Sequence, residues 1–528
     1  MKTAHRVTVI ALLWLMFVNP GSITNLDTER RLNMSHAWWT RTEESFSGNK
    51  VVININGKNY VPYDLGQSML MLPGDWLGEK LGQNIDNEKE RQYFREAVVS
   101  FLIFLPINLL AVLTCFKFLQ LVGYSERIAG LSSIVWLLGT SVLFYSSFHQ
   151  QNNQILLFVL ISYQAALAYV LKDKKSLAIL SGASLGVAFL IRITSILYAV
   201  SVLIFLIGCV FSKRKLKSSF SRAFKALTLW MTGFVPFILL ERILTYVRYG
   251  DWTATSTSLH LQIYSKASSL GDPNAIVEGA NKGFSFLKLL TKVQPEALLA
   301  PLFSPEKSIF LYDPLVLPCL ILFFICQKFL SQYIKWYVTT VIISFILHTY
   351  IYSWTSNWIT DGVWGARYHI TLVHLLLVPL IPLLVRGAMK QAKNININSS
   401  QLALRSIARI IIVVAILIQF ASISLDFSLE ATQHTLGVGS RFYIVQRFDN
   451  IFAKIDRADK NSLHLPKIKD SADKTALKNK LRWDFLPFLY QNDLKNDSSL
   501  NKFMPVLFGV WALIFIFAAI TTAWIFFE

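Results

Sequence analysis

The stretch AVVSFLIFLPINLLAVLTCFKFLQL, residues 97–121, decides the fold class of this chain. Its only charged residue is Lys117, and it is long enough to cross about 30 Å of hydrocarbon as a helix. The chain has 528 residues, of which 53% are hydrophobic and 16% charged, a composition unlike that of soluble domains. Further apolar runs fall at about 7–24, 128–147, 153–171, 176–191, 195–211, 226–246, 309–329, 336–352, 369–385, 406–425 and 503–526. We therefore predict an all-α polytopic membrane protein with about twelve transmembrane helices.

The formal charge of +19 gathers largely in short loops between these runs and in one long polar segment. Short cytoplasmic loops are rich in Lys and Arg, so the clusters mark the cytoplasmic side. The clusters are Lys172, Lys174 and Lys175; Lys213, Arg214, Lys215 and Lys217; and Arg386, Lys390, Lys393, Arg405 and Arg409. Membrane topology thus accounts for the charge, and the expected partner is the lipid bilayer with no nucleic acid.

With the first run retained as an anchor, the topology places the loops at about 25–96, 247–308 and 353–368 outside the cytoplasm. The first of these loops is expected to hold amphipathic helices on the membrane surface and one strand-like piece, VVININGKNYVPYDL. We divide the chain into a main transmembrane region, 1–425, a small polar extramembrane region, 426–502, and a last transmembrane helix, 503–528.

Charged and polar residues from separate segments are expected at the outer membrane edge. They are Asp27, Glu29, Arg30 and Arg31 after the first run, His149 after the third, Arg192 at the tip of a short helical pair, Lys307 before the eighth, and Arg367 and Tyr368 before the tenth. Together they suit recognition of an anionic lipid headgroup next to a general base. Taken alone, Arg192 could snorkel, His149 could be an interface histidine, Asp27 could cap a helix, and Lys307 could pair with Glu306.

No metal-ligand cluster stands out, and the four cysteines form no C-x-x-C pair. We therefore predict no cofactor, and fixed cations rather than a metal would stabilise a departing phosphate.

The chain resembles GT-C glycosyltransferases, in the group related to dolichyl-phosphate-mannose–protein mannosyltransferases (glycosyltransferase family 39) and bacterial lipid A aminosugar transferases. The resemblance covers most of the chain. It rests on Asp27 and its followers, NYVPYDLGQSMLMLP (59–73), FYSSFHQQNNQ (144–154), FLIRITS (189–195), LFSPEKSIFLYDP (302–314) and SNWITDGVWGARYHITLVHLLLVPL (356–380). The last two are the most specific.

The resemblance implies inverting transfer of a sugar from a polyprenyl-phosphate carrier to a glycan, lipid or protein acceptor, catalysed by region 1–425. It places the active site on the non-cytoplasmic face of the cell inner (plasma) membrane. Asp27 matches the family's general base, with Glu29 as the alternative. Arg192, Lys307, Arg367, His149 and Tyr368 would bind the donor phosphate, and Arg30, Arg31, Tyr63 and Trp364 would support the site. Trp354, Trp358 and Trp364 are candidates for stacking on the sugar.

Two other functions fit the sequence. A lipid-linked sugar transporter or flippase would carry ionisable groups near the bilayer midplane and two related halves, whereas this chain shows edge clustering and no repeat. A catalytically inactive relative could serve as an assembly partner. The acidic, His and Arg positions favour the enzyme.

Overall fold

The computed structural model describes residues 3–42, 53–55, 58–60, 62–213, 216–256, 258–259, 294–353, 363–389, 399–455, 470–493 and 502–527. The chain divides into two compact units. Unit 1 contains 1–22, 104–148 and 295–528, and unit 2 contains 23–103 and 149–294.

Unit 1 is helical throughout its described residues. Its α-helices are α1 (Thr3–Val18), α5 (Leu105–Leu121), α6 (Glu126–Leu138), α7 (Val142–Phe148), α15 (Pro295–Phe303), α16 (Ile309–Tyr312), α17 (Val316–Cys326), α18 (Gln332–Tyr352), α19 (Ile370–Leu377), α20 (Ile381–Ala388), α21 (Ser399–Ser424), α22 (Leu429–Thr435), α23 (Tyr443–Ile455), α25 (Ser471–Lys480), α26 (Leu486–Asp493) and α28 (Met504–Phe527).

Unit 2 combines long helices with a small hairpin. Its elements are α2 (Leu26–Thr40), β1 (Ile53–Ile55), β2 (Lys58–Tyr60), α3 (Gly66–Leu81), α4 (Glu88–Val99), α8 (Gln151–Lys172), α9 (Lys175–Ile191), α10 (Ile196–Lys213) and α11 (Leu216–Tyr249). The two strands pair antiparallel, with Ile53 opposite Tyr60. The strand-like piece predicted in the first outside loop is therefore a hairpin, and the loop also holds helices.

The structure confirms an all-helical multi-pass membrane protein but not twelve spans. Among the described residues, seven helices are long and apolar enough to cross a membrane, or up to nine if each of two bent pairs counts as one span. The bent pairs are α6 with α7, at 57°, and α19 with α20, at 49°. The remaining predicted runs hold shorter apolar helices, Thr3–Val18, Lys175–Ile191 and Val316–Phe329. Hydropathy located each apolar run, but it did not predict the residues at which the helices within these runs end.

Local sequence explains two of the short helices. In α1 the helix ends before Asn19 and Pro20, and the Asn19 side chain accepts a hydrogen bond from the N–H of Gly21 (2.8 Å). The predicted run 309–329 is interrupted at Asp313 and Pro314, which separate α16 from α17. Proline lacks a backbone donor, and the residue before it avoids the helical conformation.

In unit 1 the first helix packs against the last. The indole N–H of Trp14 donates to Thr522 Oγ1 (2.8 Å), and the Trp511 indole donates to the carbonyl of Phe17 (3.0 Å). The Phe17 and Trp511 rings stack with centroids 4.8 Å apart. Helix α1 also packs on α5 and α6, so it lies inside the helical layer of this unit.

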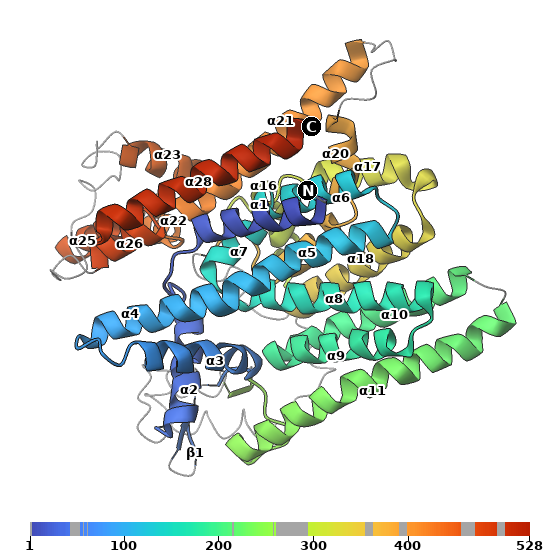
Figure 1. The fold of residues 1–528 in the computed structure, drawn as a ribbon, viewed down its shortest axis with the longest axis horizontal. Coiled ribbons are helices and arrows are strands. Elements are labelled where there is room, and N and C mark those ends of the chain that lie inside the picture. The colour runs from blue at the N-terminus through green and yellow to red at the C-terminus, as the bar shows by residue number, and fades with distance from the viewer. Residues whose placement is uncertain are drawn as a thin grey trace. The chain divides into compact units, whose positions relative to one another are not determined.

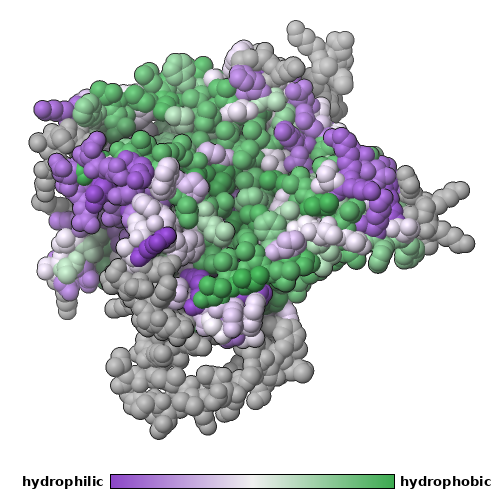
Figure 2. Space-filling view, turned by 60° about the horizontal axis from the view of Figure 1, so that its bottom comes forward, coloured by the Kyte–Doolittle hydropathy of each residue, from purple (hydrophilic) through white to green (hydrophobic). Residues whose placement is uncertain are grey.

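In unit 2, α8, α9, α10 and α11 lie side by side (Figure 1). Helices α9 and α11 approach closely because glycines face the partner backbone. A Cβ atom added at Gly182 would lie 2.0 Å from the carbonyl oxygen of Trp230, and one at Gly233 would lie 2.1 Å from that of Ile179. Small residues permit this approach where lipid provides no hydrophobic driving force. Hydrophobic side chains cover much of the surface in view, as expected for a protein surrounded by lipid (Figure 2).

The region 426–502, predicted as polar and extramembrane, contains α22, α23, α25 and α26. Leu425, Leu429, Leu477 and Leu481 form a small buried core there. Figure 1 shows these short helices gathered near the end of α28 that lies opposite the C terminus. The region thus has a packed interior of its own.

Candidate functional site

The site in unit 2 begins at the first turn of α2. The side-chain oxygen of Asn25 accepts hydrogen bonds from the N–H groups of Asp27 (2.8 Å) and Thr28 (3.2 Å), so Asn25 is the helix cap. This cap holds Asp27 in the first turn, where the positive end of the helix dipole favours a carboxylate. The capping function considered for Asp27 therefore belongs to Asn25.

Tyr63 contacts Asp27 and both arginines of the same helix face. Its hydroxyl donates to Asp27 Oδ1 (2.7 Å) and accepts from Arg30 Nη1 (3.3 Å). The Arg31 guanidinium lies 4.1 Å from the centre of the Tyr63 ring. Burial and the charge of Asp27 raise the pKa of Tyr63, so its hydroxyl stays protonated and serves as a donor. Because residues three and four positions apart share a helix face, Asp27, Arg30 and Arg31 can all meet this tyrosine.

Asp64 links the tyrosine loop to the break between α9 and α10. Its Oδ2 accepts a hydrogen bond from the N–H of Ile193 (3.3 Å), which directly follows Arg192. Arg192 has an extended backbone and ends α9. Burial raises the pKa of Asp64, while the Ile193 bond and the charges of Arg31 and Arg192 oppose the rise. We call Asp27, Arg30, Arg31, Tyr63, Asp64 and Arg192 the Asp27 cluster.

A cavity of about 20 Å³ adjoins Tyr63 and Asp64. Arg248 from the end of α11 forms part of its wall, and Arg248 Nη1 donates to the carbonyl oxygen of Tyr63 (3.4 Å). The guanidinium of Arg248 also lies 4.8 Å from the centre of the Tyr249 ring. The volume is about that of one water molecule, so a sugar would require movement of these walls.

The backbone of His149 contacts two neighbours of the Asp27 cluster, Thr28 and Gln67. Its carbonyl oxygen accepts hydrogen bonds from Thr28 Oγ1 (3.2 Å) and Gln67 Nε2 (3.0 Å). Its side chain is buried, with Nε2 2.6 Å from Ser100 Oγ, and its backbone is left-handed with φ 56°. These contacts are those of a residue that holds the first turn of α2 in place.

Glu29, the alternative base, lies on a different side of α2. Two residues along a helix correspond to a rotation of about 200°, so Glu29 faces away from the side that carries Asp27. Its electrostatic neighbours are Arg30 and Glu96. Burial raises the pKa of Glu29, and the charge of Arg30 opposes the rise.

In unit 1, the two most specific motifs meet. The ammonium group of the buried Lys307 donates to the carbonyl oxygen of Val363. The next residue, Trp364, is buried with its ring 4.7 Å from that of Tyr312, and its carbonyl oxygen accepts from the Tyr145 hydroxyl (3.0 Å). Residues 302–314 and 363–369 therefore form one packed arrangement.

Arg367 and Tyr368 follow Trp364 in a turn. The Arg367 guanidinium lies 5.9 Å from the centre of the Tyr368 ring, and that ring stacks on Tyr352 at 4.4 Å. Both side chains are half-buried. The other two tryptophans considered for sugar stacking, Trp354 and Trp358, lie outside the described residues.

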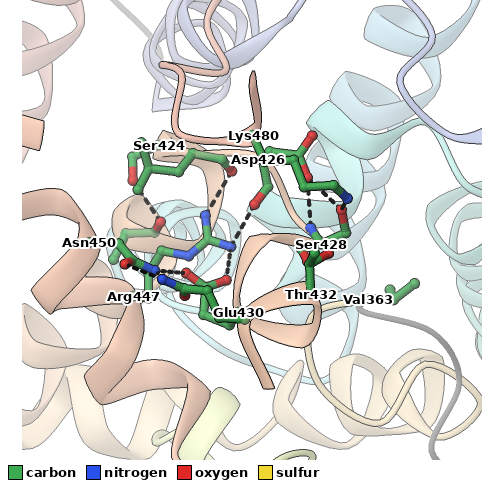
Figure 3. A network of polar contacts seen from close by, with 12 residues as sticks. Val363, Ser424, Asp426, Ser428, Glu430, Thr432, Arg447, Asn450 and Lys480 are labelled. Atoms are coloured by element: carbon green, nitrogen blue, oxygen red, sulfur yellow. Dashed lines mark hydrogen bonds and ion pairs between the residues drawn. The ribbon is translucent and has the colours of Figure 1, made fainter. Parts of the chain in front are cut away.

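The region 426–502 contains a buried ion pair between Arg447 and Glu430 (Figure 3). Arg447 Nη2 lies 2.5 Å from Glu430 Oε2, and both side chains are almost completely buried. Arg447 also donates to the carbonyl oxygens of Leu425 (2.7 Å) and Asp426 (3.0 Å), and its guanidinium lies 5.7 Å from the centre of the Trp364 ring. Asn450 donates to Glu430 Oε1 (2.9 Å). Burial raises the pKa of Glu430, and Arg447 opposes this rise.

The sequence pattern did not identify three residues that matter to these arrangements. Asp64 was present in the quoted NYVPYDLG motif, and its position beside Tyr63 was the available signal. Glu430 and Arg447 lie in the region 426–502, whose polar composition predicts exposure to solvent. No local sequence pattern indicated that these two side chains are buried. Among the described residues, no group of three His, Cys, Asp or Glu side chains could hold a metal ion.

Comparison with known proteins agrees with the resemblance seen in the sequence. Residues 96–239 match the family model of dolichyl-phosphate-mannose-protein mannosyltransferases. No curated protein matches the chain. Among solved structures, the chain is similar to ArnT from Cupriavidus metallidurans bound to undecaprenyl phosphate, with 12% identity and a TM-score of 0.44, over 83% of this chain and 73% of that chain. Residues 96–239 are thus the part of the chain that is similar to dolichyl-phosphate-mannose-protein mannosyltransferases.

Proposed function

We propose that this protein transfers one sugar from a polyprenyl-phosphate-linked donor to an acceptor at the non-cytoplasmic face of the plasma membrane, with inversion at the anomeric carbon. The observation that carries the proposal is the Asp27 cluster. It combines a carboxylate at a helix start, a tyrosine that orients it at 2.7 Å, and arginines on the same helix face. The family supplies the reaction class.

Asp27 is the proposed base. It removes the proton from the acceptor hydroxyl as the acceptor oxygen attacks the anomeric carbon, the bond from that carbon to the phosphate oxygen breaks, and the electron pair leaves on the lipid phosphate. Tyr63 fixes the orientation of the carboxylate. Asp27 is favoured over Glu29 because Asp27 shares a helix face with Arg30 and Arg31, whereas Glu29 has Glu96 as an electrostatic neighbour.

Fixed cations would bind the leaving phosphate. Arg192 is the leading candidate in unit 2, with Arg30 and Arg31 supporting it, because guanidinium groups bind phosphate oxygens in a bidentate geometry. Lys307, Arg367 and Tyr368 are the candidates in unit 1, where Lys307 already donates to a backbone carbonyl. The contacts of His149 favour a positioning function over direct phosphate binding.

The choice of membrane face rests on the basic residues of unit 2. Lys213 Nζ donates to the carbonyl oxygen of Val170 (2.8 Å), and Arg222 forms an ion pair with Asp173 (3.3 Å). The basic ends of α8, α9 and α10 therefore lie together, while Arg192 ends α9 at its other terminus. Because short basic loops stay in the cytoplasm, the Asp27 cluster belongs on the opposite face.

The test compares cell-envelope glycans and lipids by mass spectrometry in cells with and without the gene. Cells lacking it are complemented with wild type, Asp27→Asn, or the control Asp86→Asn, which changes an exposed carboxylate of the same unit. We expect one sugar-bearing species to disappear on deletion and to return with wild type and the control. Asp27→Asn should lower transfer by about 10²- to 10⁴-fold, the usual contribution of general base catalysis.

Retained binding of undecaprenyl phosphate by purified Asp27→Asn, measured by native mass spectrometry, would separate loss of chemistry from loss of fold. Full complementation by Asp27→Asn would exclude Asp27 as the base. An unchanged envelope in cells without the gene would support the inactive-relative alternative.

A further inference from the structure

Helix α23 in the region 426–502 has its polar side turned inward and its apolar side turned outward. Gln446, Arg447 and Asn450 are buried. On the outer side, Val445, Phe452 and Ile455 are 57%, 61% and 60% exposed. A helix on the surface of a water-soluble domain has the opposite arrangement.

The inward polar face is fixed by its partners, so α23 cannot rotate to bury the apolar face. Arg447 binds Glu430 and two backbone carbonyl oxygens of residues 425–426. Asn450 donates to Glu430 Oε1 and Gln433 Oε1 (both 2.9 Å), and Gln433 donates back to Asn450 Oδ1 (3.0 Å). Rotation of α23 would leave the Glu430 charge buried without a partner, which is strongly unfavourable.

Helix α23 lies next to a candidate membrane span. Helix α23 packs against α21, a candidate span that carries the exposed apolar residues Ile410, Val413 and Leu417. The chain leaves α21 at Ser424 and reaches α23 within twenty residues. Helix α23 thus packs beside a candidate span whose own exposed side chains are apolar.

We propose that α23 is an interfacial membrane helix whose Val445, Phe452 and Ile455 side chains insert among lipid acyl chains at the rim of the bilayer. Helices with a large apolar side and a polar opposite side bind at this depth. Arg441 and Lys454 lie near the two ends of the helix, where cations meet lipid phosphates. The exposed Asp449 lies one turn from both Val445 and Phe452, and its carboxylate would stay at the level of the headgroups. The proposal goes beyond sugar transfer and does not depend on it.

The test uses full-length protein in nanodiscs of phosphatidylethanolamine and phosphatidylglycerol. Cys326 is the partly exposed cysteine, whereas Cys115, Cys209 and Cys319 are buried, so a Cys326→Ser background limits unwanted labelling. Nitroxide spin labels are placed at Val445→Cys and Phe452→Cys. Asn479→Cys on an exposed polar position of α25 is the control for water, and Val510→Cys on α28 is the control for lipid.

The readout is collision of the nitroxide with oxygen, which concentrates in lipid, relative to a water-soluble nickel chelate. We expect the ratio at Val445→Cys and Phe452→Cys to follow Val510→Cys and to exceed the ratio at Asn479→Cys. A ratio equal to that of Asn479→Cys would overturn the proposal. Labels that are immobilised and reached by neither reagent would also overturn it, because a protein surface, such as a second copy of the chain, would then cover the helix.

Discussion

In unit 2, Asp27 and its arginines are half-buried or nearly buried and contact Tyr63, which lines a small cavity, whereas in unit 1 Glu430 and Arg447 are sealed from solvent. Both arrangements combine a carboxylate with arginine, but only Glu430 forms a direct ion pair with a guanidinium among the contacts described. The first is held by a helix cap and a tyrosine, and its arginines also stack and bind backbone. In the second, both carboxylate oxygens of Glu430 accept hydrogen bonds, one from Arg447 and the other from Asn450.

This difference separates a carboxylate that supports the fold from one that can act as a base. A carboxylate whose two oxygens are saturated in a closed interior cannot accept a substrate proton, and its partner cannot leave without a large desolvation cost. A carboxylate at an accessible helix start can meet an incoming hydroxyl. The variants below test this division, from the largest expected effect to the smallest.

Arg447→Met should destabilise unit 1 by about 3–5 kcal/mol, because it leaves the Glu430 charge buried and unpaired. The measurement is the yield and thermal unfolding of protein in detergent. The double variant Glu430→Leu with Arg447→Met should recover much of the loss, since both charges are then absent. If Arg447→Met unfolds at the wild-type temperature, the ion pair between Arg447 and Glu430 does not stabilise unit 1.

Arg192→Ala should raise KM for the lipid-linked donor by about 100-fold with a smaller change in kcat, from loss of about 3 kcal/mol of charge-assisted hydrogen bonding. With undecaprenyl phosphate as a probe, native mass spectrometry should show the same weakening. Arg91→Ala is the control, because Arg91 forms only a partly exposed ion pair with Glu79 (3.8 Å) among the contacts described. Equal donor affinity in Arg192→Ala and Arg91→Ala would remove Arg192 from the phosphate site.

Tyr63→Phe should lower kcat by roughly tenfold, the effect of losing one hydrogen bond of about 1.5 kcal/mol to an ionised group. The ring that stacks with Arg31 remains, so thermal unfolding and donor binding should stay near wild type. A large loss of donor binding without a change in kcat would show that Tyr63 binds the donor and does not orient Asp27.

Glu29→Gln should leave transfer close to wild type and slightly raise the unfolding temperature near neutral pH. Because burial raises the pKa of Glu29, the folded state binds the proton more tightly than the unfolded state, and wild type loses stability as pH rises through that pKa. Gln stays neutral and avoids this loss, so the advantage of the variant should vanish below the ordinary value of 4.5. Abolished transfer in Glu29→Gln would reverse the choice of base.

Hydropathy and charge were sufficient to predict a multi-spanning helical protein, because runs of apolar residues and basic loops have a direct physical cause in the bilayer. Span number was less predictable. Asn19 with Pro20 and Asp313 with Pro314 shorten helices within runs that remain apolar on average. The bends at α6–α7 and α19–α20 depend on packing that a hydropathy average does not contain.

The candidate site was predictable where the residues lie one helical turn apart, as Asp27, Arg30 and Arg31 do. Asp64 was missed as a separate group because its partner, the N–H of Ile193, is 129 positions away and carries no sequence signature. Arg447 was missed because its residue type predicts exposure, and only the fold brings Glu430 and Asn450 around it.

The pairing of α1 with α28 sets an order for biosynthesis. The partners of Trp14 and Phe17, Thr522 and Trp511, are made about five hundred residues later, roughly half a minute or more at common elongation rates. During that interval the inner face of α1 has to be shielded by lipid, by the translocation machinery or by α5 and α6. All residues of unit 2 precede residue 295, so they are available while the ribosome is still at work. Synthesis of α28, rather than insertion of any earlier helix, is then the event that completes unit 1.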